Sequence, residues 1–374
     1  ELVPLTLTQC QDCGLTQLTH DYDLDDLYRR GYGYRSGVNQ TMREHLGGIT
    51  KQLKSHVTLK PGNTVLDIAS NDGTLLQSYS ASGINLVGID PTIEQYRDYY
   101  PDGAFLSPEF FSKEVFAEVS PTDKAQIISS IAVFYDVPDP DRFTVDIASI
   151  LDENGVWVME QSYLPMLVAD LSFDSICHEH LGYYCLKQIN LAARAAGLRV
   201  FDVETNAMNG GSIRAFLCHE NASHKANEQA LAEIKTLEAE AKLDSIDTFK
   251  AFHQKVSEIG EQLVELLKNA KAAGKTIHIY GASTKGNVLL QLYGIDRTLI
   301  DAAAERNEWK FGHRTPGTNI PIISEEESRA QKPDYFLVLP WHFRDEFIKR
   351  EKVFVEGGGK LIFPLPEVEV YPAN

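Results

Sequence analysis

The feature that most constrains the fold is an apolar run bounded by turn residues. Asn-Thr-Val-Leu-Asp-Ile-Ala over 63–69 follows Pro61-Gly62 and precedes Ser-Asn-Asp-Gly. A continuous run of this kind is typical of a strand buried on both faces, as in a parallel sheet. We therefore expect a buried strand at 63–69.

Strand-like and helix-like segments alternate after this run. We expect a helix over 74–82 and a strand over 84–89 that ends at Asp90, with further strands over 125–128, 155–159 and 198–203. A strand, a Gly-bounded turn and a helix recur at 275–280, 281–286 and 287–293. Such alternation implies right-handed βαβ units, so the fold class is α/β with a doubly wound sheet.

The 374 residues fit two or three domains, and four zones differ in composition. Residues 1–55 contain a Cys-x-x-Cys and a Gly-rich aromatic stretch, and 56–205 form the first α/β zone. Residues 206–272 form a connector strand and a long amphipathic helix, because apolar residues recur at steps of three and four. Residues 273–374 form the second α/β zone.

Charge excludes several classes of partner. The chain has 53 acidic and 35 basic residues, a formal net charge of −18. Duplex nucleic acid and anionic membrane surfaces both require clustered Lys and Arg, so neither partner is expected. No run reaches the ~18–20 apolar residues of a membrane span. Five scattered cysteines suggest reduced thiols in a cytoplasmic protein.

The turn after the first strand is a candidate cofactor site. Ligands of open α/β sheets bind at the carboxyl ends of strands, and an acid that ends the second strand can accept hydrogen bonds from ribose hydroxyls. A dinucleotide normally requires Gly-x-Gly-x-x-Gly. This turn instead offers Asp67, Asn71, Asp72 and Gly73, with Asp90 beyond. Carboxylates suit a cationic cofactor, so S-adenosylmethionine is favoured over NAD; the alternative is an ordinary strand-to-turn junction.

Titratable side chains are densest at 173–184, Phe-Asp-Ser-Ile-Cys-His-Glu-His-Leu-Gly-Tyr-Tyr. Such density indicates a site, because ionisable groups are costly to bury. One histidine could be a general base oriented by Glu179. His178 and His180 could instead bind a metal with Glu179 or Cys177, or the segment could be a polar loop.

Cys10 and Cys13 resemble half of a four-cysteine zinc site. The other cysteines, Cys177, Cys185 and Cys218, lie far away in sequence. Only a half site can therefore be assigned, with structural zinc as a possible ligand.

Three further segments are candidates for ligand binding. The aromatic stretch at 32–45, with Tyr34 and Arg35, is either a lid over the cofactor or a packed connector. Asn209-Gly210-Gly-Ser-Ile-Arg214 could bring backbone amides and a guanidinium to a phosphate, or be a plain β-turn. The turn with Lys285 could cradle a phosphate but lacks an NTPase motif.

Taken together, these motifs resemble the sugar C-methyltransferases of deoxysugar biosynthesis, and the resemblance covers essentially the whole chain. It includes Cys-x-x-Cys-Gly-Leu-x-Gln-Leu at 10–18, Tyr-Arg-Ser-Gly-x-Asn at 34–39, Asn-Asp-Gly at 71–73, Glu-His at 179–180, Gly-Gly-Ser at 210–212 and Tyr-Gly-Ala-Ser-Thr-Lys at 280–285. The resemblance implies a zinc-module remnant and lid over 1–55, a class I (Rossmann-like) methyltransferase domain over 56–205 and a Rossmann-like domain over 273–374.

The family implies a nucleoside-diphosphate 4-keto-6-deoxyhexose as substrate, methylated at C3 by S-adenosylmethionine. His180 resembles the base that removes the C3 proton, Glu179 would hold its ring, and Tyr183 or His178 would stabilise the enolate oxygen. Cys177 stands where the family has a tyrosine, and Asp136 where some relatives have a histidine. Arg214 and Lys285 are candidates for the diphosphate, and Cys177, Asn209 and Gly210 for other parts of the substrate.

Two alternatives remain open at this point. One is a nicotinamide-dependent sugar oxidoreductase, against which the missing Gly-x-Gly-x-x-Gly argues. The other is a non-catalytic nucleotide-sugar binding protein with the same two pockets.

Overall fold

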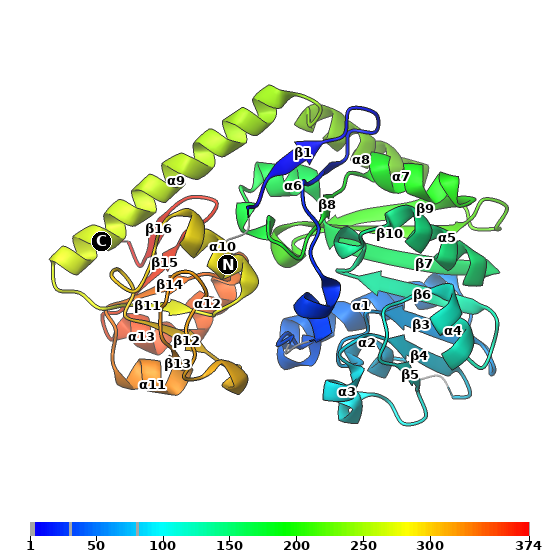
Figure 1. The fold of residues 1–374 in the computed structure, drawn as a ribbon, viewed down its shortest axis with the longest axis horizontal. Coiled ribbons are helices and arrows are strands. Elements are labelled where there is room, and N and C mark those ends of the chain that lie inside the picture. Colours follow the sequence, from blue (N-terminus) through cyan, green and yellow to red (C-terminus); the bar gives the residue numbers. More distant parts are fainter. Residues whose placement is uncertain (1–3, 30–31, 80–81, 374) are drawn as a thin grey trace. The chain divides into compact units, whose positions relative to one another are not determined.

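The chain folds into two compact units in a computed structural model that describes residues 4–29, 32–79 and 82–373. Unit 1 comprises Glu1–Leu164, His178–Asn206 and Ser212–Glu240. Unit 2 comprises Pro165–Cys177, Ala207–Gly211 and Ala241–Asn374 (Figure 1). Each unit contains one large sheet, as the two α/β zones of the sequence predict.

Unit 1 is built on a seven-stranded sheet of order β5-β4-β3-β6-β7-β10-β9. Its strands are β3 (Thr64–Ile68), β4 (Asn85–Ile89), β5 (Phe105–Ser107), β6 (Ala125–Ile131), β7 (Leu151–Ser162), β9 (Leu198–Asn206) and β10 (Ser212–His219). The first five pair in parallel, and β10 pairs antiparallel with both β7 and β9. The carboxyl ends of the parallel strands therefore meet at one edge, where ligands of such sheets bind.

Helices cover both faces of this sheet. They are α1 (Gln40–His56), α2 (Thr74–Gln77), α3 (Ile93–Tyr96), α4 (Lys113–Val119), α5 (Pro140–Ile150), α7 (Leu186–Ala195) and α8 (Glu228–Ala241). Helix α6 (Leu164–Ala169) begins at the last residue of the first segment of unit 1, and its other residues belong to unit 2. Val156 and Val158 of β7 join the apolar core formed with α1 and α2. Trp157, between them, points to the opposite face and meets Phe143 of α5 at 6.4 Å between ring centroids.

A second sheet in unit 1 connects the N-terminal segment to the histidine-rich one. Strands β1 (Leu7–Gln9), β2 (Thr16–Leu18) and β8 (Gly182–Tyr183) form it, all antiparallel. Strand β8 begins two residues after His180, so the N-terminal hairpin helps to fix the segment that carries this histidine (Figure 1).

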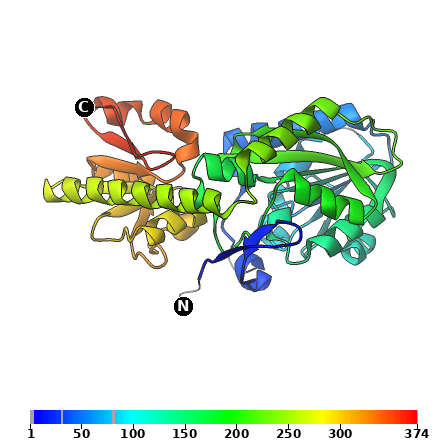
Figure 2. The same cartoon turned by 90° about the horizontal axis from the view of Figure 1, so that it is seen from above.

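Unit 2 contains a six-stranded sheet of order β13-β12-β11-β14-β15-β16. Its strands are β11 (Ile277–Tyr280), β12 (Ala302–Glu305), β13 (Ile322–Ser324), β14 (Tyr335–Val338), β15 (Lys360–Phe363) and β16 (Glu369–Tyr371), and only β16 pairs antiparallel. Helices α9 (Ile246–Ala272) and α10 (Thr284–Leu292) pack on one face, and α12 (Arg344–Arg350) and α13 (Lys352–Glu356) on the other, with α11 (Glu325–Ala330) following β13. Figure 2 shows α9 as one unbroken helix.

Two short segments from earlier in the chain complete unit 2. Leu171 and Phe173 are buried in the core that α9 and α10 share, and the Phe173 ring lies 5.3 Å from that of Tyr293. The Trp341 indole donates to Asp174 at 3.0 Å, and Lys285 Nζ donates to the carbonyl of Asn209 at 2.8 Å. Unit 2 is thus discontinuous in sequence, whereas the sequence suggested consecutive zones.

The predicted strands agree with the structure to within a few residues at their starts. The helix expected over 74–82 is shorter, since α2 ends at Gln77, and residues 80–81 lie outside the described part of the chain. Helix α10 begins at Thr284 rather than 287, because the Ser283 side chain caps it. The predicted long helix corresponds to α9, separate from α8. Among the described helices, none combines the length and the apolar character needed to span a bilayer.

Candidate active site

The loop after β3 adopts an unusual backbone conformation at the edge of the sheet. Asn71 and Gly73 both have positive φ, 52° and 72°. A Cβ on Gly73 would lie 2.7 Å from the Tyr100 ring, so both the conformation and the space require glycine. The backbone amide of Asn71 donates to Asp90 Oδ2 at 2.8 Å, which ties the loop to the end of β4.

Two aspartates lie buried at this edge. Asp90 is 5% exposed, and its Oδ1 accepts bonds from the Thr92 amide at 2.6 Å and the Thr92 hydroxyl at 2.5 Å. Burial raises the pKa of Asp90, although these bonds oppose the shift. Asp67 is 4% exposed; burial raises its pKa to about 7 against the effect of a 2.6 Å bond from Ser129 Oγ.

The predicted lid segment lies directly on this loop. Arg35 Nε and the Gly37 amide each donate to Asp72 Oδ2 at 3.0 Å. Asn71 binds the same segment with both groups of its side chain: Nδ2 donates to the carbonyl of Tyr34 at 3.0 Å, and Oδ1 accepts from the Ser36 amide at 2.9 Å. The structure therefore brings together the four predicted cofactor residues Tyr34, Arg35, Asn71 and Asp72, and it neutralises Asp72 with Arg35.

These residues fit S-adenosylmethionine better than a pyrophosphate. The edge offers carboxylate and carbonyl acceptors, and Asp90 at the end of β4 has the position of an acid that binds ribose hydroxyls. Acceptors suit hydroxyls, an ammonium and a sulfonium, whereas pyrophosphate requires a cluster of donors.

His180 lies buried in the same unit. It is 7% exposed, and its ring centroid lies 4.2 Å from that of Tyr135. The Leu181 amide donates to the carbonyl of Tyr135 at 2.8 Å, so the histidine segment is fixed to the turn after β6. A carboxylate oxygen of Glu179 lies within 4.8 Å of a ring nitrogen of His180. A base and a neighbouring acid are thus present together.

Asp136 and two tyrosines extend this group. The Tyr28 hydroxyl donates to Asp136 Oδ2 at 3.0 Å, while Asp136 Oδ1 is buried and finds no partner among the described residues. Burial, and then the charge of Glu179, raise the pKa of Asp136 well above its ordinary value. Burial likewise raises the pKa of Tyr32, and the charges of Glu179, Asp136 and Asp90 add to the shift. Tyr32 therefore lies within electrostatic range of both the histidine segment and the cofactor edge.

The other predicted catalytic residues lie near the N-terminal hairpin. The His178 ring packs edge-on against Tyr22 at 4.8 Å between centroids. Tyr183 is 4% exposed on β8, where it pairs with Thr16 of β2. Among the described residues, the possible metal ligands that come together here are Cys177, Glu179 and His180, with ligand atoms within 4.8 Å of one another, and His178 is not part of that group.

The predicted substrate residues are divided between the units. Arg214, in unit 1, is 7% exposed and is ion-paired with Glu160 at 2.7 Å and with Glu204. Two carboxylates therefore occupy its guanidinium, which weakens its assignment to a diphosphate. Asn209, Gly210 and Lys285 belong to unit 2, where the Lys285 ammonium binds the Asn209 carbonyl. Cys177, also in unit 2, is 1% exposed.

Cys10 and Cys13 lie on the tight turn between β1 and β2. Backbone amides of Cys13 and Asp12 lower the pKa of the Cys10 thiol. Within 4–29, 32–79 and 82–373, no group of three possible metal ligands includes either cysteine. Two thiolates alone do not complete a zinc site, so the described residues supply the half site and no more.

Sequence reasoning missed several residues at the carboxyl edge. Gln161, at the end of β7, is 1% exposed, and neither its amide oxygen nor its nitrogen has a partner among the described residues. Ser162 Oγ is in the same situation. Gln161 shares a face of β7 with Trp157, since side chains alternate along a strand. The signal that could have identified these residues was the pair of polar residues that closes the buried strand.

Known proteins share both halves of this architecture. A methyltransferase domain model matches residues 40–203, and a C-methyltransferase C-terminal domain model matches residues 207–366. The chain is 31% identical to C-methyltransferase NovU of Streptomyces niveus over 374 residues, which is 100% of this chain and 89% of that protein.

Solved structures show weaker likeness. A putative methyltransferase in complex with the Haloferax volcanii Trm112 activator matches with a TM-score of 0.40 and 17% identity, over 49% of this chain and 94% of that one. CalO1, a methyltransferase of calicheamicin biosynthesis, matches with a TM-score of 0.36 and 13% identity, over 48% of this chain and 55% of that one. The full-length similarity to NovU and the two domain matches decide the family: the chain belongs to the S-adenosylmethionine-dependent C-methyltransferases.

Proposed function

We propose that this protein methylates a nucleotide-linked 4-keto-6-deoxy sugar at C3, with S-adenosylmethionine as the methyl donor. The observation that carries the proposal is the buried His180, with the Glu179 carboxylate within 4.8 Å, in the unit that contains the methyltransferase sheet. A base of this kind suits carbon methylation, because carbon must lose a proton before it can attack.

The residues at the edge of the sheet have separate roles. Asp90 and the loop over 70–73 bind the cofactor, which supplies an electrophilic methyl group when bound. His180 removes the proton from C3, and the electron pair moves onto the C4 oxygen of the ketone to form an enolate. The enolate carbon is then the nucleophile for the methyl group that the cofactor would supply, and the sulfur would keep the electron pair of the bond that breaks.

Glu179 stabilises the imidazolium that forms on His180. A neutral Asp136, whose Oδ2 accepts the Tyr28 hydroxyl, offers a hydroxyl donor at Oδ1, and the Gln161 amide offers an N–H donor at the end of β7. Donors placed at a developing oxyanion contribute several kcal/mol in other enzymes. We therefore assign the enolate oxygen to this group of donors rather than to a metal.

The test is methyl transfer from labelled S-adenosylmethionine to a panel of nucleoside-diphosphate 4-keto-6-deoxy sugars. We expect incorporation of label at C3 of at least one sugar. His180→Ala should lower turnover at least ~100-fold, as loss of a general base does, while calorimetry shows unchanged cofactor affinity. Asp90→Asn should instead weaken cofactor binding.

The matched control is His253→Ala, since His253 is exposed on α9. It should retain wild-type turnover. Near-normal turnover in His180→Ala would contradict the assignment of the base. Oxidation of a nicotinamide cofactor, or binding of the sugars without product, would contradict methyl transfer itself.

A further inference from the structure

The histidine segment brings together three side chains of the kinds that bind transition-metal ions. The Cys177 thiol, the Glu179 carboxylate and the His180 imidazole each offer one ligand atom, and these atoms lie within 4.8 Å of one another. The three residues fall within the short range 177–180, so this one stretch of the chain sets their separation. In the part of the chain that the structure describes, no other three candidate ligands form such a group.

The size of this group is close to what a tetrahedral ion requires. When three atoms lie within 4.8 Å of one another, a point exists about 2.8 Å or less from each, whereas zinc bonds are about 2.3 Å to sulfur and about 2.0–2.2 Å to nitrogen or carboxylate oxygen. Each ligand atom therefore needs to move by less than ~1 Å to bind an ion. A fourth position is left for water, as in zinc sites with three protein ligands.

The charges of the three side chains suit a divalent cation. Cys177 is 1% exposed and His180 is 7% exposed, so the group is largely removed from water. With a metal ion bound, the cysteine is a thiolate and the glutamate a carboxylate, two negative charges that are costly to bury without compensation. A divalent ion cancels both charges, and the neutral imidazole adds a third bond without adding charge. The loaded group is therefore neutral, which is the favourable state for a buried site.

The surroundings of the group also favour a cation. Burial raises the pKa of Asp136 and of Tyr32, and the negative charge of Glu179 adds to both shifts. The field of Glu179 therefore reaches beyond its own side chain. A cation beside Glu179 offsets this field, so its binding lowers the electrostatic energy of the region.

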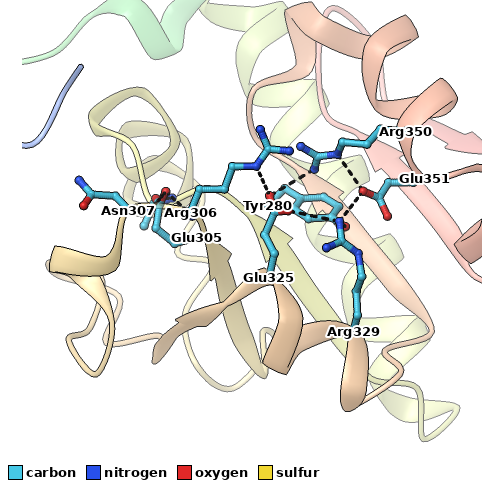
Figure 3. A network of polar contacts seen from close by, with 9 residues as sticks. Tyr280, Glu305, Arg306, Asn307, Glu325, Arg329, Arg350 and Glu351 are labelled. Atoms are coloured by element: carbon cyan, nitrogen blue, oxygen red, sulfur yellow. Dashed lines mark hydrogen bonds and ion pairs between the residues drawn. The ribbon is translucent and has the colours of Figure 1, made fainter. Parts of the chain in front are cut away.

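Unit 2 shows how the chain compensates a buried carboxylate with cations of its own. Glu351 is 3% exposed and pairs with Arg329 and Arg350, each at 2.8 Å (Figure 3). Asp136 has no such ion pair among the described residues, since its Oδ2 accepts from a tyrosine hydroxyl and its Oδ1 has no partner there. A metal ion on Glu179 would bring to this region the positive charge that arginines provide in unit 2.

We propose that Cys177, Glu179 and His180 bind a thiophilic divalent cation such as Zn²⁺, and that the bound ion inhibits methyl transfer. The Cys177 thiol loses its proton to solvent as the bond between sulfur and the ion forms. The ion takes the lone pair of a ring nitrogen of His180, and a nitrogen bound in this way cannot accept the proton from C3. The metal site is independent of the reaction, whereas the inhibition rests on the proposed function.

The thiol determines which ions bind. Thiolate and imidazole ligands favour Zn²⁺ and Co²⁺, whereas Mg²⁺ and Ca²⁺ prefer sites built of oxygen ligands. Co²⁺ bound to a thiolate also has a charge-transfer absorption band, which reports the sulfur directly. These ions therefore distinguish the group from a cluster of carboxylates that attracts any divalent cation.

The test titrates the full-length protein, as purified, with Zn²⁺ by calorimetry and with Co²⁺ by absorbance. We expect wild type to bind an ion that gives a thiolate band, and we expect this band to be missing from Cys177→Ser. Cys177→Ser and Glu179→Gln should each weaken Zn²⁺ binding at least ~10-fold, because even groups outside the ligand shell change metal affinity by ~10–100-fold. Glu179 is only partly buried, so its variant tests the site without emptying a core position.

Cys185→Ser is the matched control. It removes another buried thiol, and serine is a good residue at the N-cap of α7, where Cys185 lies. Its metal affinity should equal that of wild type. All of these proteins keep Cys10 and Cys13, so an ion bound by those thiols contributes equally and cancels in the comparison.

Saturating Zn²⁺ should lower wild-type methyl transfer at least ~100-fold, as loss of a general base does, and a chelator should restore it. Mg²⁺ at the same concentration should leave turnover unchanged. Equal Zn²⁺ affinity in wild type and Cys177→Ser, or equally tight binding of Mg²⁺, would overturn the site.

Failure of the metal site and failure of the proposed function give different patterns. If no sugar is methylated but Zn²⁺ binding depends on Cys177 and Glu179, the proposed function fails and the metal site stands. If sugars are methylated and Zn²⁺ does not bind, only the metal site is overturned. Methyl transfer at the full rate with Zn²⁺ bound would overturn the inhibition.

Discussion

Individual acidic residues at the cofactor edge differ in charge state, although all count equally in the formal charge. Asp72 is paired with Arg35 at 3.0 Å, and burial raises the pKa of Asp67 to about 7. Burial also raises the pKa of Asp90. The edge is therefore less negative than its sequence suggests, and in the proposed function it would hold the cofactor by hydrogen bonding as well as by charge.

The protonation of Asp136 can be tested through the pH dependence of activity. Because burial and Glu179 raise its pKa, the carboxyl remains protonated at pH values where an ordinary aspartate is ionised. Asp136→Asn keeps the shape and the neutral charge, so we expect its turnover to stay within about 3-fold of wild type near neutral pH, whereas Asp136→Leu, without a donor, should lose at least ~10-fold.

The direction of the pH effect distinguishes a neutral Asp136 from an ionised Asp136. A neutral donor is lost as pH rises through its raised pKa, so wild-type kcat should fall on the alkaline side where Asp136→Asn does not. Profiles of kcat against pH for both proteins provide the measurement. An Asn variant that is inactive at every pH would show that the carboxylate form is the required one.

At the scale of elements, the lid segment can lie close to the loop over 70–73 because Gly37 has no side chain. A Cβ there would lie 2.7 Å from Asp72 Oδ2 and 2.8 Å from Thr74 Oγ1. Asp72 cannot move away easily, since it is 1% exposed and bound by Arg35. The fit of the lid on the loop therefore depends on this one position.

Gly37→Ala should displace the lid and weaken S-adenosylmethionine binding about 10-fold in a calorimetric titration. Overpacking of a tight contact typically costs ~1–3 kcal/mol, so the melting temperature should fall as well. Gly47→Ala is the matched control, because nothing lies within 4 Å of its Cβ and it lies inside α1. That change should leave cofactor affinity unchanged and stabilise the helix by about 0.5–1 kcal/mol. Equal cofactor affinity in both variants would separate the lid from cofactor binding.

The elements that could be predicted from sequence are those whose pattern is continuous and local. Buried strands such as β3 and β4 have apolar runs between turn residues, so their positions follow from burial on both faces. Strands of two or three residues, such as β1, β2 and β8, have no such pattern. The pairing of β2 with β8 joins residues more than 160 positions apart, and only tertiary packing determines it. The lid contacts and the Tyr28–Asp136 bond also depend on such distant pairing.

The individual site residues show the same limit. The positions of Asp67, Asn71 and Asp90 follow from strand ends, so sequence places them correctly at one edge. From sequence, Arg214 could bind a phosphate, because the local pattern does not show that it pairs with Glu160 of β7 and Glu204 of β9. Register, which sequence did not provide, places Arg214 opposite Glu160 and Glu204 in the sheet.

The whole molecule cannot be divided at a single point in the sequence. Unit 2 takes Pro165–Cys177 and Ala207–Gly211 from the part of the chain that otherwise forms unit 1. Phe173 is 3% exposed in the unit 2 core, and Asp174 accepts a hydrogen bond from Trp341. After a cut in the turn between α8 and α9, residues before the cut would therefore still make buried contacts with residues after it.

A protease site inserted between Asp244 and Ser245 should give two fragments that remain associated after cleavage. Burial of one large apolar side chain contributes ~1.5–3 kcal/mol, and Leu171 and Phe173 together supply roughly twice that. We expect one peak in size-exclusion chromatography of the cleaved protein and two bands under denaturing conditions.

Phe173→Ala removes a buried ring, at a typical cost of ~3–5 kcal/mol, and should make the cleaved protein separate or aggregate at lower temperature. Leu191→Ala, an exposed position on α7 in unit 1, should not change the association. Fragments that separate freely without denaturant would show that the two short segments are not integral to unit 2. The C-terminal unit would then be an independent domain that begins after α8.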